Sequence, residues 1–113
     1  MSDCLFCAIA AGDIPATIVK RTDSVVVFAD INAQAPVHVL AIPVAHYDTI
    51  ADLVQADPRL TAELLAVATQ AADELGLDEG YRVVFNTGKN GGQTVGHVHA
   101  HVLGGRHMGW PPG

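Results

Sequence analysis

The histidines near the end of the chain are the residues best suited to chemistry. Residues 97–103 read His-Val-His-Ala-His-Val-Leu. In an extended strand, successive side chains point to opposite faces, so the imidazoles would share one face and the small apolar residues the other. Imidazole can act as a nucleophile, a proton donor or a metal ligand near neutral pH. The run therefore predicts a reactive row of histidines on one face of a sheet.

Two other interpretations of this run have to be weighed. A helix would also place His97 and His101 on one face, four residues apart. The valines between the histidines favour a strand, and Gly104-Gly105 ends the run after seven residues, which is short for a helix. Three solvated histidines are the other alternative, but a polar sheet face normally mixes side-chain types.

A glycine-rich segment, residues 87–95 (Thr-Gly-Lys-Asn-Gly-Gly-Gln-Thr-Val), leads into the histidine run. Glycines let the backbone turn with its amides exposed, which creates an anion site, and the Thr94 hydroxyl adds a donor. A phosphate held there would lie beside the imidazole row. A plain hairpin loop is the alternative for this segment.

At such a site the middle histidine, His99, is the predicted nucleophile. A neutral imidazole can attack phosphorus and form a phosphohistidine intermediate, provided that a partner on its other ring nitrogen fixes the tautomer. His101 would protonate the departing group or bind a phosphate oxygen. His38, on a predicted central strand, is the candidate partner across the site, and a half-buried histidine with a structural role is an equal alternative.

The chain has two cysteines, Cys4 and Cys7. This spacing suits two thiolates on one zinc ion, and a tetrahedral site would need two further ligands, for which histidines are the candidates. A redox pair of the thioredoxin type is an alternative, although no βαβ pattern surrounds it. Two buried thiols without a metal are the other.

Asp30 follows a predicted strand and opens the segment Asp30-Ile31-Asn32. A carboxylate at a strand end can accept hydrogen bonds from a ribose diol, as acidic residues do in other nucleotide-binding folds. An Asx turn is the alternative, and spacing alone favours it.

The elements that must position these residues follow from periodicity and turn signals. A short helix is expected over residues 4–10 with Asp3 as its cap, and one long helix over residues 58–75 after the cap Asp57. Strands are predicted over residues 17–21, 24–29, 37–43, 81–86 and 97–103. The order β-β-β-α-β-β predicts an α+β fold, in which the long helix covers a five-stranded antiparallel sheet.

Composition limits the classes of function. The chain has 113 residues, of which 50% are hydrophobic and 16% charged, so we expect one domain over residues 1–113 with a real core. Its net charge of −6 argues against a non-specific partner such as nucleic acid or an anionic membrane. No apolar stretch approaches the ~20 residues of a membrane span, and no signal-peptide pattern opens the chain. A cytoplasmic protein is therefore expected.

Together these residues resemble the histidine triad (HIT) superfamily, and within it the Hint branch. The signature His-φ-His-φ-His-φ-φ, in which φ is apolar, matches residues 97–103 at every position. The likeness extends along essentially the whole chain, through residues 4–7, 12–15, 28–31, 35–40, 42–43, 46, 91–93, 104–106 and 110–113.

The resemblance implies a homodimer whose two sheets join into one, with the long helices packed at the interface. It also implies hydrolysis of the phosphorus–nitrogen bond of purine nucleoside phosphoramidates, with release of a purine nucleotide such as AMP. A zinc-dependent hydrolase, whose strand histidines hold a catalytic metal, is one alternative. A nucleotide-binding regulatory module with little turnover is the other.

By this resemblance His99 is the nucleophile, His101 contacts the phosphate and assists the leaving amine, and His38 supports His99. The phosphate site is lined by Asn86, Gly92, Thr94 and Val95. Asp30 holds the ribose. The walls of the base pocket are Phe6, Ile9, Ile14 and Ile31. The tail that carries Trp110 would lie near the partner's site.

Relatives that keep the Cys-x-x-Cys motif bind zinc with it, so the resemblance implies a zinc site at Cys4 and Cys7. The remaining two ligands are then His46 and His97, and the closed shell implies a structural ion.

Four residues depart from the family pattern. Gly96 stands where relatives often carry an aromatic residue, Thr94 replaces the more usual serine, and His107 and Gly109 vary the tail. These departures concern rate and leaving-group preference rather than the class of reaction.

Overall fold

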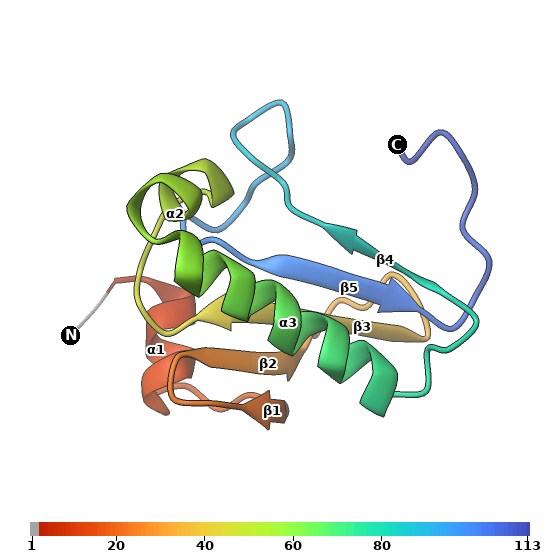
Figure 1. The fold of residues 1–113 in the computed structure, drawn as a ribbon, viewed down its shortest axis with the longest axis horizontal. Helices are drawn as coiled ribbons and strands as arrows, with labels where there is room; N and C mark the ends of the chain where they lie inside the picture. Colours follow the sequence, from red (N-terminus) through yellow and green to blue (C-terminus); the bar gives the residue numbers. More distant parts are fainter. Residues whose placement is uncertain (1–2) are drawn as a thin grey trace.

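The computed structural model describes residues 3–113 and contains one antiparallel sheet (Figure 1). The five strands lie side by side in the order β1-β2-β3-β5-β4, and every neighbouring pair is antiparallel. The strands are β1 (Ile18–Arg21), β2 (Val25–Ala29), β3 (Val37–Pro43), β4 (Tyr81–Val84) and β5 (Ala100–Gly104). The predicted α+β class and five-stranded antiparallel sheet are confirmed.

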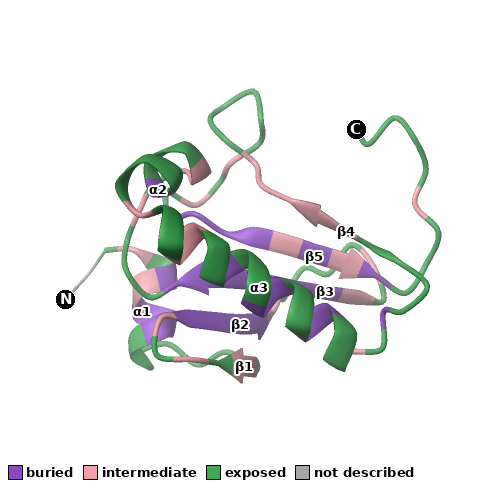
Figure 2. Ribbon diagram, viewed as in Figure 1, coloured by how far each residue is buried: buried purple, intermediate pink, exposed green. Residues whose placement is uncertain are grey.

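Helix α3 (Pro58–Glu74) covers one face of the sheet, as Figures 1 and 2 show. Its cap is Asp57, whose carboxylate accepts a hydrogen bond from the Leu60 N–H at 3.0 Å, as predicted. The buried side of α3 packs on inward-facing strand residues. This larger core consists of Val25, Val27, Val39, Ala41, Leu53, Leu64, Val67, Ala68, Ala71, Ala72, Leu77, Val98, Ala100 and Val102.

Helix α1 (Leu5–Ala11) packs on the opposite face, because the strand residues that it contacts alternate with those under α3. This smaller core consists of Phe6, Ile9, Ala10, Val26, Phe28, Leu40 and Ile42. The prediction that Asp3 caps this helix was wrong. Cys4 is the cap, and its sulfur accepts from the Cys7 N–H at 3.4 Å. Gly12 ends the helix in the left-handed conformation, with φ 83°.

A second short helix, α2 (Ile50–Ala56), was not predicted from the sequence. Thr49 caps it by accepting from the Asp52 N–H at 3.1 Å. Only Leu53 of this helix is buried. A single buried residue makes no apolar stripe, so periodicity gave no sign of the helix.

The last strand is shorter than predicted, because β5 begins at Ala100 rather than His97. Strand β4 ends at Val84, which pairs with His101, so residues 97–99 have no strand neighbour on that side. The Val98 N–H instead donates to the Tyr47 carbonyl at 2.7 Å. The predicted alternation still holds, since Val98, Ala100 and Val102 belong to the core under α3.

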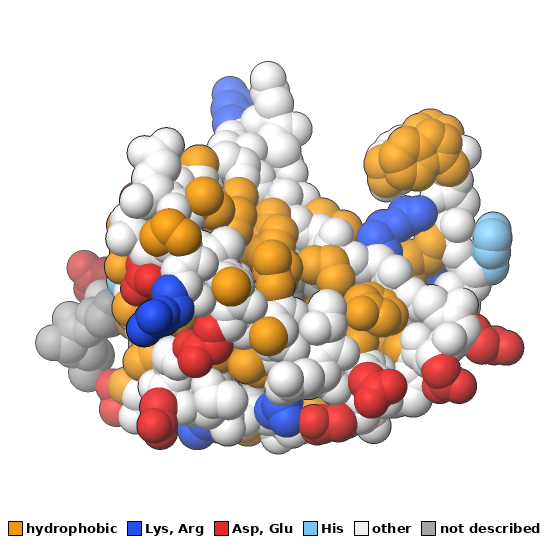
Figure 3. Space-filling model, viewed as in Figure 1, with side chains coloured by type: hydrophobic (Ala, Val, Ile, Leu, Met, Phe, Trp, Pro, Cys, Tyr) orange, Lys and Arg blue, Asp and Glu red, His pale blue; other side chains and the backbone are white. Residues whose placement is uncertain are grey.

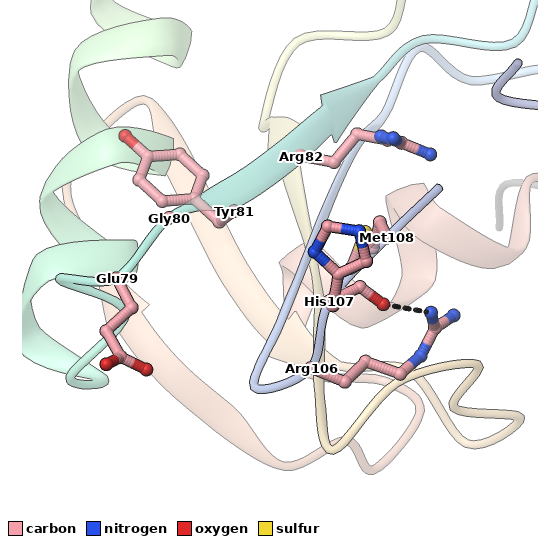
Figure 4. A pocket seen from close by; sticks show the side chains of 7 residues that line it. All are labelled: Glu79, Gly80, Tyr81, Arg82, Arg106, His107 and Met108. Carbon is pink, nitrogen blue, oxygen red and sulfur yellow. Dashed lines mark hydrogen bonds between the residues drawn. The ribbon is translucent and has the colours of Figure 1, made fainter. Parts of the chain in front are cut away.

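The tail that follows β5 leaves the sheet and is held by two arginines. Arg82 donates to the Gly109 carbonyl at 2.8 Å, and Arg106 donates to the Gln34 carbonyl at 3.0 Å. A cavity of about 220 Å³ lies between the start of β4 and this tail (Figure 4). Both guanidinium groups are thus occupied in fastening the tail. In the described part of the chain, no helix is long and apolar enough to cross a membrane.

The core under α3 generates a stability prediction. Leu64 is fully buried there, so Leu64→Ala should lower the free energy of unfolding by about 2–5 kcal/mol through lost apolar burial and a residual cavity. The matched control is Gln70→Ala on the exposed side of the same helix, which should change it by less than about 0.5 kcal/mol. Urea denaturation measures both, and equal losses would contradict the assignment of the buried side.

Candidate active site

A cavity of about 530 Å³ opens beside the histidine row, on the face of the sheet that α1 covers. Its lining combines apolar side chains with histidines, a carboxylate and a hydroxyl. Its lining is Leu5, Phe6, Ile9, Ile14, Pro15, Ala16, Phe28, Ala29, Asp30, Ile31, Asn32, Gln34, His38, Leu40, Thr94, Val95, His99 and His101. A cavity of this size and mixed character is typical of a site for a small organic ligand.

The hydrogen bonds of His99 define its tautomer. Its Nδ1 lies 2.8 Å from the carbonyl oxygen of His97. A carbonyl can only accept, so Nδ1 carries the proton and donates it. The lone pair is therefore on Nε2, in a ring that lines the cavity and is 6% exposed. A neutral imidazole held in this way is suited to act as a nucleophile.

His38 and His101 form a directed hydrogen-bonded pair next to His99. The Gln34 N–H donates to His38 Nδ1 at 3.0 Å, so the proton of neutral His38 is on Nε2. That Nε2 lies 2.9 Å from His101 Nδ1 and 3.3 Å from a carboxylate oxygen of Asp30. His101 therefore accepts at Nδ1, and its own proton is on Nε2. The amide nitrogen of Asn86 is 3.4 Å from this Nε2, and an end-for-end flip of that amide would place its oxygen to accept the proton.

Burial keeps this pair neutral. Burial, and then repulsion from the rings of His99 and His38, lowers the pKa of His101 to about 4. Burial also lowers the pKa of His38, although the nearby Asp30 carboxylate opposes this shift. Both rings are thus uncharged near neutral pH in the free protein, which agrees with the tautomers that their hydrogen bonds require.

A second group of side chains lies at the N-terminal end of α1. Cys4, Cys7, His46 and His97 each offer one ligand atom, and these four atoms lie within 4.8 Å of one another. His97 Nδ1 is 3.4 Å from Cys4 Sγ and 3.5 Å from Cys7 Sγ, and His46 Nδ1 is 3.3 Å from Cys7 Sγ. Zinc bonds of about 2.3 Å to sulfur and 2.0 Å to nitrogen, at tetrahedral angles, would place S and N about 3.5 Å apart. The donor set and its spacing fit zinc.

The outer nitrogens of both histidines are anchored, which aims the inner nitrogens at the sulfurs. His97 Nε2 donates to the Pro43 carbonyl at 2.9 Å, and His46 Nε2 donates to the Asp48 carboxylate at 2.8 Å. A carbonyl or carboxylate on one ring nitrogen leaves the lone pair of the other for a metal. Burial disfavours the Cys4 thiolate, but hydrogen bonds, first from the Cys7 N–H, outweigh this and lower the pKa of Cys4.

Asp30, His38 and His101 also lie within 4.8 Å of one another and form the other candidate metal group among the described residues. The Gln34 N–H on His38 Nδ1 requires a proton on Nε2, which occupies the position that a metal would take. This second group is therefore better suited to proton transfer. The three triad imidazoles have three different sets of partners, which argues against one catalytic metal shared by all three.

The structure gathers most of the predicted site residues, with two exceptions at the cavity surface. Asn86 approaches His101 without lining the cavity, and Gly92 lies in the preceding loop with φ 78°. Asp30 makes the alternative Asx contact, since its carboxylate accepts from the Asn32 N–H at 2.8 Å. That contact uses one oxygen, and a carboxylate has room for further donors.

Gln93 was missed by the sequence analysis, although it links the loop to the metal-ligand cluster. Its amide nitrogen donates to the carbonyls of Asp48 at 2.6 Å and Val95 at 3.0 Å, and its oxygen accepts from the Gly88 N–H at 3.1 Å. Gln93 thereby holds the segment that brings Thr94 and Val95 to the cavity. All three contacts are with backbone atoms, so no residue pattern could have revealed them.

The lowered pKa of His101 predicts how stability depends on pH. The unfolded chain takes up a proton at His101 near the ordinary pKa of 6.5, whereas the folded chain does so near 4. The free energy of unfolding should therefore fall as the pH is lowered from about 6.5 towards 4. In His101→Asn this contribution is absent. The difference in the free energy of unfolding between the wild-type protein and His101→Asn should therefore change across this pH interval. Urea denaturation over pH 4–7.5 measures it, and parallel curves would contradict the shift.

Comparison with known proteins agrees with this geometry. Residues 11–108 match the HIT domain family. A "14 kDa zinc-binding protein" of Brassica juncea is 44% identical, over 98% of this chain and 100% of that protein. The crystal structure of a HIT family hydrolase from Legionella pneumophila Philadelphia 1 superposes with a TM-score of 0.94 at 50% identity, covering 98% of this chain and 100% of that one.

A histidine triad nucleotide-binding protein from Candida albicans superposes with a TM-score of 0.83 at 32% identity. That match covers 96% of this chain and 83% of the other. The family match takes in the histidine run, the loop that precedes it and all five strands in full. This chain belongs to the HIT family.

Proposed function

We propose that this chain is a hydrolase of purine nucleoside phosphoramidates, which cleaves the phosphorus–nitrogen bond and releases a nucleoside monophosphate such as AMP. The observation that carries the proposal is the fixed tautomer of His99, with its Nε2 lone pair in a cavity beside the His38–His101 pair. The Legionella relative is called a hydrolase, and the Candida relative a nucleotide-binding protein, which supports both parts of the proposal.

In the first step, Nε2 of His99 attacks phosphorus and the phosphorus–nitrogen bond breaks. The ring becomes a phosphorylated imidazolium, whose Nδ1–H remains on the His97 carbonyl. An anionic phosphate beside His101 favours the protonated form of that ring, so His101 takes up a proton as substrate binds. His101 then gives this proton to the departing amine and becomes neutral.

In the second step, water attacks the phosphorus of the intermediate. Neutral His101 accepts a proton from this water as the new oxygen–phosphorus bond forms. The bond to His99 Nε2 breaks, and the nucleoside monophosphate and neutral His99 are regenerated. When His101 is neutral and carries its proton on Nε2, as in the free protein, His38 holds its ring, because the Nε2–H of His38 donates to His101 Nδ1 at 2.9 Å.

The apolar lining residues of the cavity suit a purine, and the polar ones suit ribose and phosphate. Phe6, Ile9, Ile14 and Ile31 form the proposed base walls. Asp30 would accept the ribose hydroxyls, while Thr94 and Val95, at the end of the glycine loop, would contact the phosphate. Asn86 and Gly92 complete the proposed phosphate site from outside the lining.

We also propose that Cys4, Cys7, His46 and His97 hold a zinc ion. The spacing of the ligand atoms fits zinc, and the Brassica relative is called a zinc-binding protein. With four protein ligands and no position for water, a bound ion would be structural. Both thiols must be reduced to act as ligands, which fits the expectation of a cytoplasmic location.

A homodimer is the third part of the proposal, as the family resemblance implies. Strand β4 lies at the edge of the sheet, where a second copy can extend it. Hydrophobic side chains gather on the side of the molecule that carries α3 and β4 (Figure 3). Leu65 of α3 and Tyr81 of β4 are exposed hydrophobic residues. Trp110, in the tail, is 84% exposed in the single chain. In such a dimer the tail would pack against the second copy.

Removal of the nucleophile tests the proposed reaction. His99→Ala should reduce kcat for an adenosine phosphoramidate with a fluorescent amine by at least about 10³-fold, because no side chain replaces the attacking nitrogen. The matched control is His107→Ala, an exposed histidine outside the cavity, which should retain activity. A wild-type chain that binds AMP but releases no amine would favour the nucleotide-binding module instead.

Removal of a ligand tests the proposed zinc site. Cys7→Ser should abolish stoichiometric zinc in the purified protein and lower Tm, because a hydroxyl does not replace a thiolate on zinc. Atomic absorption measures the metal, and His107→Ala serves again as the control that keeps it. Wild-type protein that takes up no zinc from buffered zinc solutions would contradict the proposal.

A further inference from the structure

The metal-ligand cluster and the cavity share two pieces of backbone. Cys4 and Cys7 bracket Phe6 on α1, and Phe6 lines the cavity. His97, the buried ligand candidate, stands two residues before His99, which also lines the cavity. The same short segments therefore carry both the ligand atoms and the walls of the proposed nucleotide site.

Helix α1 depends on contacts at its two ends, since seven residues are too few for a helix that is stable alone. At its C-terminal end, Arg21 donates to the Ala10 carbonyl at 3.1 Å. At its N-terminal end, the two cysteine sulfurs face His46 and His97 at 3.3–3.5 Å. In addition to the apolar packing of α1 on the sheet, the metal-ligand cluster thus helps to position its N-terminal end.

Phe6 connects this end of the helix to the reactive ring. Its ring meets His99 edge to face, with centroids 5.1 Å apart, and it also meets His97 at 6.0 Å and Phe28 at 5.5 Å. Phe6 is 5% exposed, so its ring is packed between the sheet and the cavity. A shift of the N-terminal end of α1 would move this ring away from His99.

His97 provides a second connection, through its backbone. Its imidazole is oriented by the Pro43 carbonyl and by the sulfurs, while its own carbonyl accepts the Nδ1–H of His99 at 2.8 Å. A displacement of His97 would therefore move the group that fixes the tautomer of His99. Both connections run from the ligand cluster to the same ring.

We propose that metal binding and nucleotide binding reinforce each other in this chain, with Phe6 as the positioning residue. A metal ion on the four ligands holds α1 and His97 where Phe6 and His99 receive the nucleotide. By linkage, the nucleotide then raises the affinity for the metal by the same factor. The proposal rests on the proposed nucleotide function for its ligand, and on the geometry above for the coupling.

The first experiment compares AMP affinity in zinc-loaded and zinc-depleted protein by calorimetry. The depleted protein should bind AMP at least about fivefold more weakly, the lower end of typical coupling between sites. Equal affinities would overturn the coupling and leave the nucleotide function intact. If neither form binds AMP, the proposed function itself fails, so the two failures are distinguishable.

Because zinc-depleted protein can lose its fold, a second experiment uses the loaded protein. Zinc is partitioned at equilibrium between the protein and a chromogenic chelator, with and without saturating AMP. AMP should raise the apparent zinc affinity at least about fivefold. An unchanged zinc affinity in protein that binds AMP would overturn the proposal.

Two matched variants locate the coupling. Phe6→Leu and Phe6→Ala keep all four ligands, and should bring the ratio of AMP affinities with and without zinc towards one. Ile31→Ala removes a wall of the same cavity that lies on an exposed loop without a ligand residue. It should weaken AMP binding equally in both metal states. If both Phe6 variants kept the wild-type ratio of AMP affinities with and without zinc, the role of Phe6 would be overturned.

Discussion

The burial of Val98, Ala100 and Val102 beneath α3 decides the direction of the whole histidine row. These side chains are at most 2% exposed, and α3 with the inner side of the sheet closes over them. Successive residues of an extended chain face opposite ways, so the histidines between them must face the side of α1 and the cavity. A slip by one residue would place three imidazoles in an apolar core and expose the valines, at a large cost in burial.

Backbone carbonyls then give the first two histidines of the row, His97 and His99, different tasks. Pro43 accepts from Nε2 of His97, and His97 accepts from Nδ1 of His99. A carbonyl has no proton to give, so it selects the tautomer of each ring without any ionised partner. One ring thus presents Nδ1 to the cysteines, and the next keeps its lone pair on Nε2 at the cavity. The three histidines alternate regularly in the sequence, but in the structure they belong to different sites.

Much of this arrangement was predictable, because it depends on local patterns. Asp57 and Pro58 mark the start of α3, and the alternation over residues 97–103 predicts which histidines share a face. The spacing of Cys4 and Cys7 pointed to a metal, and the structure places them with His46 and His97. The membership of this cluster came from family resemblance, since spacing could not choose among the histidines.

What could not be predicted depends on contacts between distant segments. Helix α2 buries only Leu53. Strand β5 begins later than predicted, because residues 97–99 do not pair with β4. The Gln34 N–H sets the tautomer of His38, yet a backbone donor has no signature in the sequence. Gln93 likewise works through carbonyls and an N–H. Such roles become visible only when three-dimensional neighbours are known.

The most direct measurement is to trap the intermediate. Wild-type protein is mixed with an adenosine phosphoramidate, quenched in alkaline denaturant within the first turnover, digested and mapped by mass spectrometry. The proposed mechanism predicts a nucleotidyl group on His99 that forms and decays at rates compatible with kcat. Release of AMP at the full rate with no adduct on His99, or with the adduct on another residue, would contradict it.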